Sequence, residues 1–213
     1  EGSVVIDAGG VWAGLLAWDL GIGLPMAPVR SQYWITAESD LFRRDQPFVI
    51  LPDARAYTRP EGKQLLFGLR ESKGVSVDPR QLPEDLSGFV IGRPEDEKES
   101  LLEGYPMLQP LFPGLDKIGI ARYIAGLSAY TPDGLFVLGS VPGIKGFLAA
   151  AGCCGAGLAA SGGIGRAVAE LAAGVPCPFD LTPFRVDRFG SIDPMSQAFQ
   201  KRCADARSRK VSG

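Results

Sequence analysis

The chain has 213 residues, 46% of them hydrophobic and 22% charged, which is the composition of a globular protein that can bury a core. The formal net charge of −2 gives no strong positive field, which argues against nucleic acid or an anionic membrane as a partner. The sequence has no histidine, which excludes a Ser/His/Asp triad and a histidine metal site within these residues, and no uncharged apolar run is long enough to span a membrane.

The first predicted unit is a strand, a glycine turn and a helix. Residues 4–6 are a β-branched run typical of a strand, residues 7–12 contain two glycines, and residues 13–20 favour a short helix. Units of this kind usually build parallel sheets, whose ligands gather at the carboxyl ends of the strands. The alternative is that Gly9 and Gly10 only permit a tight turn and bind no ligand.

The central part of the chain predicts antiparallel hairpins. Strands are expected at residues 29–38, 48–51, 56–59, 63–69 and 118–130, and at 135–138 after a turn at 131–134. Tyr57 and Arg59 flank Thr58 and therefore share one face of their strand. If that face lines a pocket, a phenol and a guanidinium can hold a carboxylate; the alternative is an ordinary solvated face.

A polar helix is predicted at residues 94–108, after a loop-rich stretch at 76–93. Its first turn carries Glu95, Asp96 and Glu97, and acidic residues at this position suit the helix dipole. We therefore interpret this charge run as a solvated helix start, not as a metal or catalytic cluster.

A second unit of strand, glycine turn and helix occupies residues 146–174. Residues 147–151 predict a short buried strand, and residues 158–173 show apolar positions at helical spacing. The turn between them contains Gly155 and Gly157, and it presents backbone N–H groups at the positive end of a helix. This arrangement favours cofactor binding.

The nature of the bound group remains open at the level of the residues alone. Gly155 to Ala160 matches a loose G-x-G-x-x-A fingerprint for a pyrophosphate, and Asp180 lies beyond the helix. Residues 175–178, however, form a proline-broken loop where that motif needs a second strand. Contact with another part of a ligand, or tight packing of helix against strand, is the alternative.

The C-terminal residues carry weaker signals. Residues 179–189 have little periodicity and predict a packed arm, whereas the basic residues 201–210 predict a surface helix or a frayed tail. The four cysteines show neither metal-ligand spacing nor a small disulfide framework, so we expect no metal and a reducing, cytoplasmic location.

With these segments in view, the chain resembles the C-terminal half of the D-amino-acid-oxidase-like flavoproteins, in the branch of glycine oxidase, sarcosine oxidase and dimethylglycine dehydrogenase. VVIDAGGVWAG is similar to that family's strand and turn VVNAAGAWA, and AYTRPEGKQLLFG is similar to its Y-x-x-P-x-x-G-x-x-L-x-G hairpin. The segment from GLSAYTPDG to AVAELAAG is similar to the family's closing segment, and FDLTPFRVDRF to its terminal arm. The four motifs occur in the family's order and cover nearly the whole chain.

The resemblance implies a mixed α/β fold and an FAD cofactor. The chain would be the C-terminal part of an FAD-binding Rossmann-like domain with an inserted antiparallel-sheet substrate domain. Residues 1–27 and 131–178 would belong to the FAD-binding domain, 28–130 to the substrate domain, and 179–213 to a C-terminal arm and tail. The family's N-terminal dinucleotide-binding half is not among these residues, so we expect it on another chain or segment, with this chain a fragment, a processed piece or one subunit of a split enzyme.

The resemblance also implies roles for individual residues. The pyrophosphate would lie on the missing half, while the turn at Gly155 approaches the flavin ring. A reduced flavin is anionic near N1, and a helix N-terminus stabilises such charge by about 0.3–1 kcal/mol. The expected cofactor-binding residues are Ala8, Gly9, Gly10, Trp12, Gly152, Cys153, Cys154, Gly155, Ala156, Gly157 and Leu158. The expected substrate-binding residues are Tyr57 and Arg59, and the expected catalytic residues are Tyr57, Arg122 and Tyr130.

Two departures from the family pattern bear on activity. Where relatives commonly have G-x-S-G-H-G, this chain has Ala156 in place of the histidine. An arginine that binds the substrate carboxylate in glycine-oxidase-like members is expected near Ser128 and is missing. Arg122, Arg59 or a residue on the missing half could substitute for it.

We therefore expect part of an FAD-dependent oxidoreductase that oxidises the C–N bond of a small amine or N-alkyl amino acid by hydride transfer to flavin. The alternative is a non-catalytic subunit or assembly factor that retains the flavoprotein fold, which the two departures fit. A flavin domain attached to an RNA-modifying enzyme is a third possibility, and the neutral-to-acidic charge gives it no support.

Overall fold

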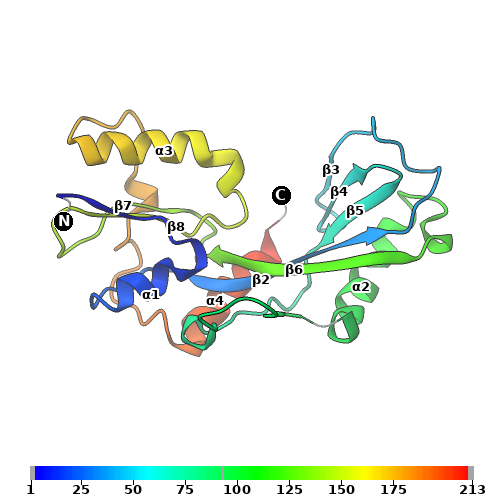
Figure 1. Cartoon of the computed structure of the whole chain (residues 1–213), viewed down its shortest axis with the longest axis horizontal. Helices are drawn as coiled ribbons and strands as arrows, with labels where there is room; N and C mark the ends of the chain where they lie inside the picture. Colours follow the sequence, from blue (N-terminus) through cyan, green and yellow to red (C-terminus); the bar gives the residue numbers. More distant parts are fainter. Residues whose placement is uncertain (1–2, 93, 211–213) are drawn as a thin grey trace. The chain divides into compact units, whose positions relative to one another are not determined.

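The computed structural model describes residues 3–92 and 94–210, and for residues 94–97 the backbone alone (Figure 1). The chain divides into two compact units. Unit 1 comprises the residues up to Val29 together with Val75–Glu84 and Leu127–Arg207. Unit 2 comprises Arg30–Gly74, Asp85–Gly126 and the residues from Ser208 onward. Residues 75–84 and most of the C-terminal arm thus belong to unit 1.

Unit 1 contains a three-stranded sheet in the order β1-β8-β7. Strand β1 (Val5–Asp7) runs parallel to β8 (Phe147–Ala151), and β7 (Val137–Ser140) pairs with β8 in the antiparallel direction. The predicted strands at 4–6 and 147–151 are confirmed. Strand β7 begins two residues later than predicted because Thr131 Oγ1 donates to the Leu135 carbonyl and holds that residue in the preceding turn.

Helices cover both faces of this sheet. Helix α1 (Ala13–Trp18), which follows the 3-10 turn η1 (Gly10–Trp12), lies on one face, and α3 (Gly157–Ala173) lies on the other (Figure 1). Alternate residues of β8 serve the two layers: Ala149 packs in the cluster of α1, and Leu148 packs in the cluster of α3. Unit 1 also contains the 3-10 turns η2 (Pro79–Gln81) and η4 (Thr182–Phe184).

The C-terminal helix α4 (Gln197–Arg209) corrects the prediction of a surface helix or frayed tail at 201–210. Phe199, Cys203 and Ala204 are buried in one cluster. The spacing of these three side chains places them on a single helix face, and the basic residues between them hid that face in the sequence. Lys201 lies on the exposed face, where it pairs with Asp205 at 2.7 Å.

Unit 2 is built on a sheet in the order β3-β4-β5-β2-β6. These strands are β2 (Ala27–Thr36), β3 (Val49–Leu51), β4 (Ala56–Glu61), β5 (Gln64–Leu69) and β6 (Ile120–Tyr130). The predicted meander of hairpins and the mixed α/β fold class are thereby confirmed.

Helix α2 (Pro94–Leu108) and the 3-10 turn η3 (Leu115–Lys117) complete unit 2. Trp34, Phe67 and Leu108 are buried together in its core, with Trp34 stacked on Phe67 at 5.8 Å between ring centroids. The predicted helix at 94–108 is confirmed. The solvated acidic turn predicted at Glu95, Asp96 and Glu97 concerns side chains that lie outside the described residues.

Candidate functional site

A pocket of ≈ 410 Å³ in unit 1 brings the two glycine turns together, and we call it the glycine-turn pocket. The carboxyl ends of β1 and β8 open into it, as expected for ligand sites of parallel strands. No charged side chain lines it. Its lining residues are Ala8, Gly10, Val11, Trp12, Leu127, Ser128, Ala129, Ala150, Ala151, Gly152, Cys153, Cys154, Gly155 and Gly157.

The first wall of the pocket is the turn after β1. Asp7 Oδ1 accepts a hydrogen bond of 3.0 Å from the Gly9 N–H, and the Gly9 carbonyl accepts one of 3.0 Å from the Trp12 N–H. Gly10 has φ +60°, a conformation that favours glycine. These bonds turn the chain sharply from strand into helix and place Ala8, Gly10 and Trp12 against the cavity.

The second wall is the turn from Gly152 to Gly157. Gly152 has φ +61°, and a Cβ there would lie 2.9 Å from the Cγ2 atoms of both Thr131 and Val137, so only glycine fits. Cys154 is buried at φ +51°, and its N–H donates to the Ala129 carbonyl at 2.9 Å. Its thiol donates to the Gly152 carbonyl at 3.1 Å. Packing and hydrogen bonds therefore fix this turn.

Helix α3 begins at the pocket. Its N-cap residue, Ala156, supplies no side-chain hydrogen bond, and the first-turn N–H groups of any α-helix have no partner within the helix. Gly157, the first helical residue, lines the cavity. The pocket thus offers donors and a positive dipole end to an electron-rich group while exposing no side-chain charge.

The structure places the expected cofactor residues unevenly. Eight of them line the pocket, whereas Gly9, Ala156 and Leu158 do not. Leu158 is 93% exposed. Sequence reasoning missed Val11, Ala150 and Ala151, and it missed Leu127 to Ala129 at the end of β6. Ala150 and Ala151 directly precede the glycine turn, and this position could have predicted them as lining residues. No local sequence pattern marks the end of β6 as part of the pocket.

Burial favours the neutral form of two thiols, that of Cys153 in the pocket and that of Cys203 in the cluster that contains Cys154. Cys153 is half-buried, and burial raises its pKa above the ordinary value. Cys203 lies in the same cluster as Cys154, and burial raises its pKa to about 12. Cys153, Cys177 and Cys203 are free. Because a thiol must ionise to act as a nucleophile, these groups are suited to packing near a ligand.

Tyr57 and Arg59 point to the same face of β4, as expected from their spacing. The Tyr57 ring stacks on Phe48 with 6.0 Å between centroids, and it also lies against the Cα of Gly68. Arg59 is paired with Glu61 at 2.9 Å, so a substrate carboxylate would compete with an internal one.

Arg122 and Tyr130 occupy different surroundings. Arg122 is exposed in unit 2 and donates a long hydrogen bond of 3.5 Å to Gln64. Tyr130 is buried in unit 1 with Cys154 and Phe199, and it does not line the glycine-turn pocket. Of the four residues expected at the substrate or in catalysis, Tyr57, Arg59 and Arg122 therefore belong to unit 2, and Tyr130 belongs to the core of unit 1.

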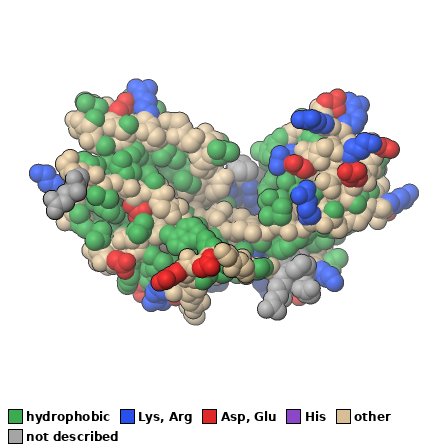
Figure 2. Space-filling model, viewed as in Figure 1, with side chains coloured by type: hydrophobic (Ala, Val, Ile, Leu, Met, Phe, Trp, Pro, Cys, Tyr) green, Lys and Arg blue, Asp and Glu red, His purple; other side chains and the backbone are tan. Residues whose placement is uncertain are grey.

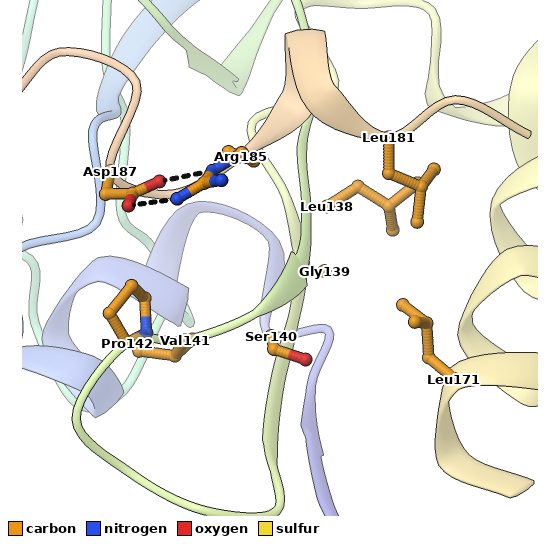
Figure 3. Close-up of a pocket in the computed structure, with 9 residues that line it drawn as sticks. All are labelled: Leu138, Gly139, Ser140, Val141, Pro142, Leu171, Leu181, Arg185 and Asp187. Carbon is orange, nitrogen blue, oxygen red and sulfur yellow. Dashed lines mark hydrogen bonds and ion pairs between the residues drawn. The ribbon is translucent and has the colours of Figure 1, made fainter. Parts of the chain in front are cut away.

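A second pocket of unit 1, of ≈ 350 Å³, lies between β7, the end of α3 and the arm that follows it (Figure 3). Arg185 reaches toward it but is bound to Asp187 by hydrogen bonds of 2.8 and 2.6 Å. Leu138, Leu171 and Leu181 line the other side. Since the guanidinium is already neutralised, this pocket offers no anion site.

Within the described part of the chain, no group of three or more potential ligand side chains could hold a metal ion. None of the helices described is both long enough and apolar enough to cross a bilayer.

These features define a class of protein: a mixed α/β fold in which glycine turns at the ends of parallel strands line a pocket without charged side chains. Residues 1–171 match the family described as FAD dependent oxidoreductase (DAO), and the chain belongs to this family. FAD is the cofactor of the family, which confirms the cofactor expected from the sequence.

Comparisons with individual proteins agree with this family assignment. The chain is 27% identical over 191 residues to the mitochondrial dimethylglycine dehydrogenase of Homo sapiens, covering 87% of this chain and 22% of that protein. It is 25% identical to the mitochondrial pyruvate dehydrogenase phosphatase regulatory subunit of Mus musculus, covering 84% of this chain and 21% of that protein. The solved structure of L-proline dehydrogenase from P. horikoshii is similar at 25% identity and a TM-score of 0.67, covering 87% of this chain and 46% of that one. The chain therefore spans less than half the length of each.

The glycine-turn pocket fits part of this cofactor. A volume of ≈ 410 Å³ lies at the low end of the range for ligand sites and suits a flat ring better than a whole dinucleotide. The uncapped start of α3 suits the electron-rich edge of a flavin.

Proposed function

We propose that this chain is part of an FAD-dependent oxidoreductase that oxidises the C–N bond of a small amine or an N-alkyl amino acid. The observation that carries the proposal is the glycine-turn pocket of a chain that belongs to the DAO family. The names of the relatives, among them a dimethylglycine and an L-proline dehydrogenase, support this substrate class. When bound, the flavin accepts a hydride at N5.

In this proposal unit 1 holds the cofactor. The turns at Ala8–Trp12 and Gly152–Gly157 border the ring from two sides, and the N–H groups at the start of α3 stabilise negative charge on it. None of the side chains that line the pocket is charged. These residues bind and orient; the chemistry needs a neutral amine held against the ring and no strong base from this chain.

Unit 2 supplies the substrate domain in this proposal. Tyr57 is the first choice for substrate contact, and its ring is held in place by Phe48 and Gly68. Arg59 and Arg122 are the candidate cations for a substrate carboxylate, and Tyr130 is a weaker candidate because it is buried in unit 1.

We further propose that an N-terminal dinucleotide-binding half, on another chain or segment, completes unit 1. Strand β1 is an edge strand that pairs only with β8 among the described strands, and Val5 and Ile6 are 54% and 45% exposed. An edge strand presents unpaired backbone N–H and C=O groups, so this edge suits pairing with a further strand. Figure 2 shows that hydrophobic side chains gather on the visible face of unit 1.

The absorption spectrum of bound flavin tests the proposal. We expect the full-length protein that contains this chain to carry FAD, and we expect anaerobic sarcosine, dimethylglycine or proline to bleach its flavin band. Tyr57→Phe and Arg59→Gln should weaken the bleaching while leaving the flavin content unchanged. A full-length protein without flavin would contradict the proposal.

A non-catalytic subunit is the second candidate. The similarity to a regulatory subunit favours it. So do Ala156, where family members commonly carry histidine, and Ser128, near which glycine-oxidase-like members carry arginine. A bound flavin that none of the three substrates bleaches would favour this candidate.

We also propose a cytoplasmic or similarly reducing location. The free thiols of Cys153, Cys177 and Cys203 support it, because thiols persist in a reducing compartment.

A further inference from the structure

Asp7 is a buried carboxyl group with one unsatisfied oxygen. It is the last residue of β1, and the whole residue is 5% exposed. Oδ1 accepts the hydrogen bond from the Gly9 N–H, whereas Oδ2 is buried and has no hydrogen-bond partner within the described residues. A buried carboxylate with a bare oxygen is strongly disfavoured relative to its neutral form.

Among the described residues, the elements that contact β1 supply no cation to this group. Asp7 lies opposite Ala149 in the register of β1 and β8, so its side chain shares the sheet face that α1 covers. Neither β8 (FLAAA) nor α1 (AGLLAW) carries an ionisable side chain, and η1 (GVW) carries none. Asp19, which follows α1, is negative. Arg80 of η2, which contacts α1, is paired with Asp78, and Arg166 and Glu170 belong to α3 on the opposite face. Burial accordingly raises the pKa of Asp7, and the bond from Gly9 only partly offsets this.

The carboxyl group is linked to the glycine-turn pocket through the backbone. Oδ1 holds the Gly9 N–H, the Gly9 carbonyl holds the Trp12 N–H, and Trp12 lines the pocket. Ala8, the residue after Asp7, lines it as well. Any change in the carboxyl group that alters its bond to Gly9 therefore alters the wall of the cavity.

We propose that Asp7 is a positioning residue that acts as a neutral acid: it holds the turn at Ala8–Trp12 in place, and its ionisation weakens flavin binding in the glycine-turn pocket. Ionisation releases the Oδ2 proton to solvent and leaves a negative charge beside a site that favours electron-rich groups. The flavin part of this inference rests on the proposed function; the protonation state of Asp7 does not.

Two variants of the full-length protein separate the roles of charge and hydrogen bonding. Asp7→Asn keeps the Oδ1 acceptor and replaces the neutral hydroxyl by an amide donor, and it cannot ionise. Asp7→Leu has a similar size and removes the acceptor for the Gly9 N–H. Thermal unfolding of the apoprotein and FAD affinity, both followed between pH 5 and pH 9, are the two measurements.

The native protein and the two variants are expected to give different results. The native apoprotein loses stability as the pH rises, because above the ordinary carboxyl pKa of 3.8 the unfolded state ionises and the folded state does not. The stability of Asp7→Asn does not fall with rising pH for this reason, because its amide cannot ionise. The FAD dissociation constant of the native protein rises by up to about tenfold per pH unit above the pKa of Asp7, whereas that of Asp7→Asn stays at the native low-pH value. Asp7→Leu binds FAD weakly at every pH.

Two results would overturn the inference. If Asp7→Asn shows the native pH dependence in both measurements, Asp7 is not the titrating group and the inference is overturned. If Asp7→Leu folds and binds FAD as Asp7→Asn does, the bond to Gly9 does not position the turn, which also overturns it. If no protein binds FAD, the proposed function and the flavin part both fail, while the unfolding curves still decide whether Asp7 is neutral.

Discussion

The ring of Tyr57 lies across the Cα of Gly68, its partner in the register of β4 and β5. A Cβ at residue 68 would collide with the ring carbons and the hydroxyl. Glycine within a strand is usually unfavourable, and here it provides the space in which the aromatic ring rests. The two residues therefore fix the position of the phenol that we propose as a substrate contact.

Gly68→Ala is expected to displace the Tyr57 ring and to lower the free energy of unfolding by about 1–3 kcal/mol through overpacking. Urea unfolding measures the loss. Gly126→Ala in β6 is the matched control, because a Cβ there meets no atom within 4 Å and the stability should be unchanged or slightly raised. Equal losses in the two variants would show that the ring does not rest on Gly68.

Gly152→Ala is expected to lower the free energy of unfolding by about 2–4 kcal/mol, because the added Cβ meets Thr131 and Val137 at a positive φ. The double variant with Thr131→Ser removes one of the two opposing methyl groups and keeps the hydroxyl that binds Asp133. Its loss should be smaller than the sum of the single losses. Strict additivity would contradict this contact.

Arg188 and Asp133 join the C-terminal arm to the turn before β7 through hydrogen bonds of 2.8 and 2.9 Å. Arg188→Ala should cost about 1–3 kcal/mol at pH 7, because the pair is bidentate and the arginine side chain is only 11% exposed. Arg185→Ala is the control from the same arm; its exposed pair with Asp187 should give no measurable change.

The contribution of this pair should depend on pH. Burial alone would raise the pKa of Asp133, but the bonds from Arg188, Leu135 and Thr131 together lower it. A carboxyl with a lowered folded pKa stabilises the protein above its unfolded value of 3.8 and loses that effect as the pH falls through the folded pKa. The difference between native protein and Arg188→Ala should therefore shrink in acid, as unfolding curves at pH 7 and pH 3 can measure.

Thiol modification should follow burial. Cys153 and Cys177 are both partly exposed, but burial raises the pKa of Cys153, so Cys177 should react first with a thiol reagent and Cys153 more slowly. Cys203 should react only on unfolding. Bound FAD should protect Cys153 and leave the rate of Cys177 unchanged. Cys177→Ala removes the fast phase and identifies it. Rapid modification of Cys203 in the folded protein would contradict the buried cluster around α4.

The sequence predicted those features that depend on local patterns. The boundaries of β8 were correct to the residue because Gly146 and Gly152 flank a short apolar run. The start of β7 was misplaced because a side-chain hydrogen bond from Thr131 set it. The buried face of α4 was missed because small residues such as Cys203 and Ala204 carry little hydrophobic signal among basic neighbours.

The site was predicted in part for the same reason. Glycines such as Gly10 and Gly152 predict turns from the sequence because they can adopt a positive φ, and both turns line the pocket. The contribution of Leu127 to Ala129 depends on where the end of β6 lies in the folded chain, which no local pattern encodes. The bare oxygen of Asp7 likewise becomes visible only when its neighbours are known.

The pairing of β1 with β8 has a consequence for the order of folding. Val5 and Phe147 are register partners although they lie about 140 residues apart, so closing this contact carries a large loop entropy. The hairpins of β3, β4 and β5 need only short loops and can form while the chain is still being synthesised. Strand β1 is synthesised well before its partner β8, so Val5 and Ile6 stay without this pairing until β8 has left the ribosome.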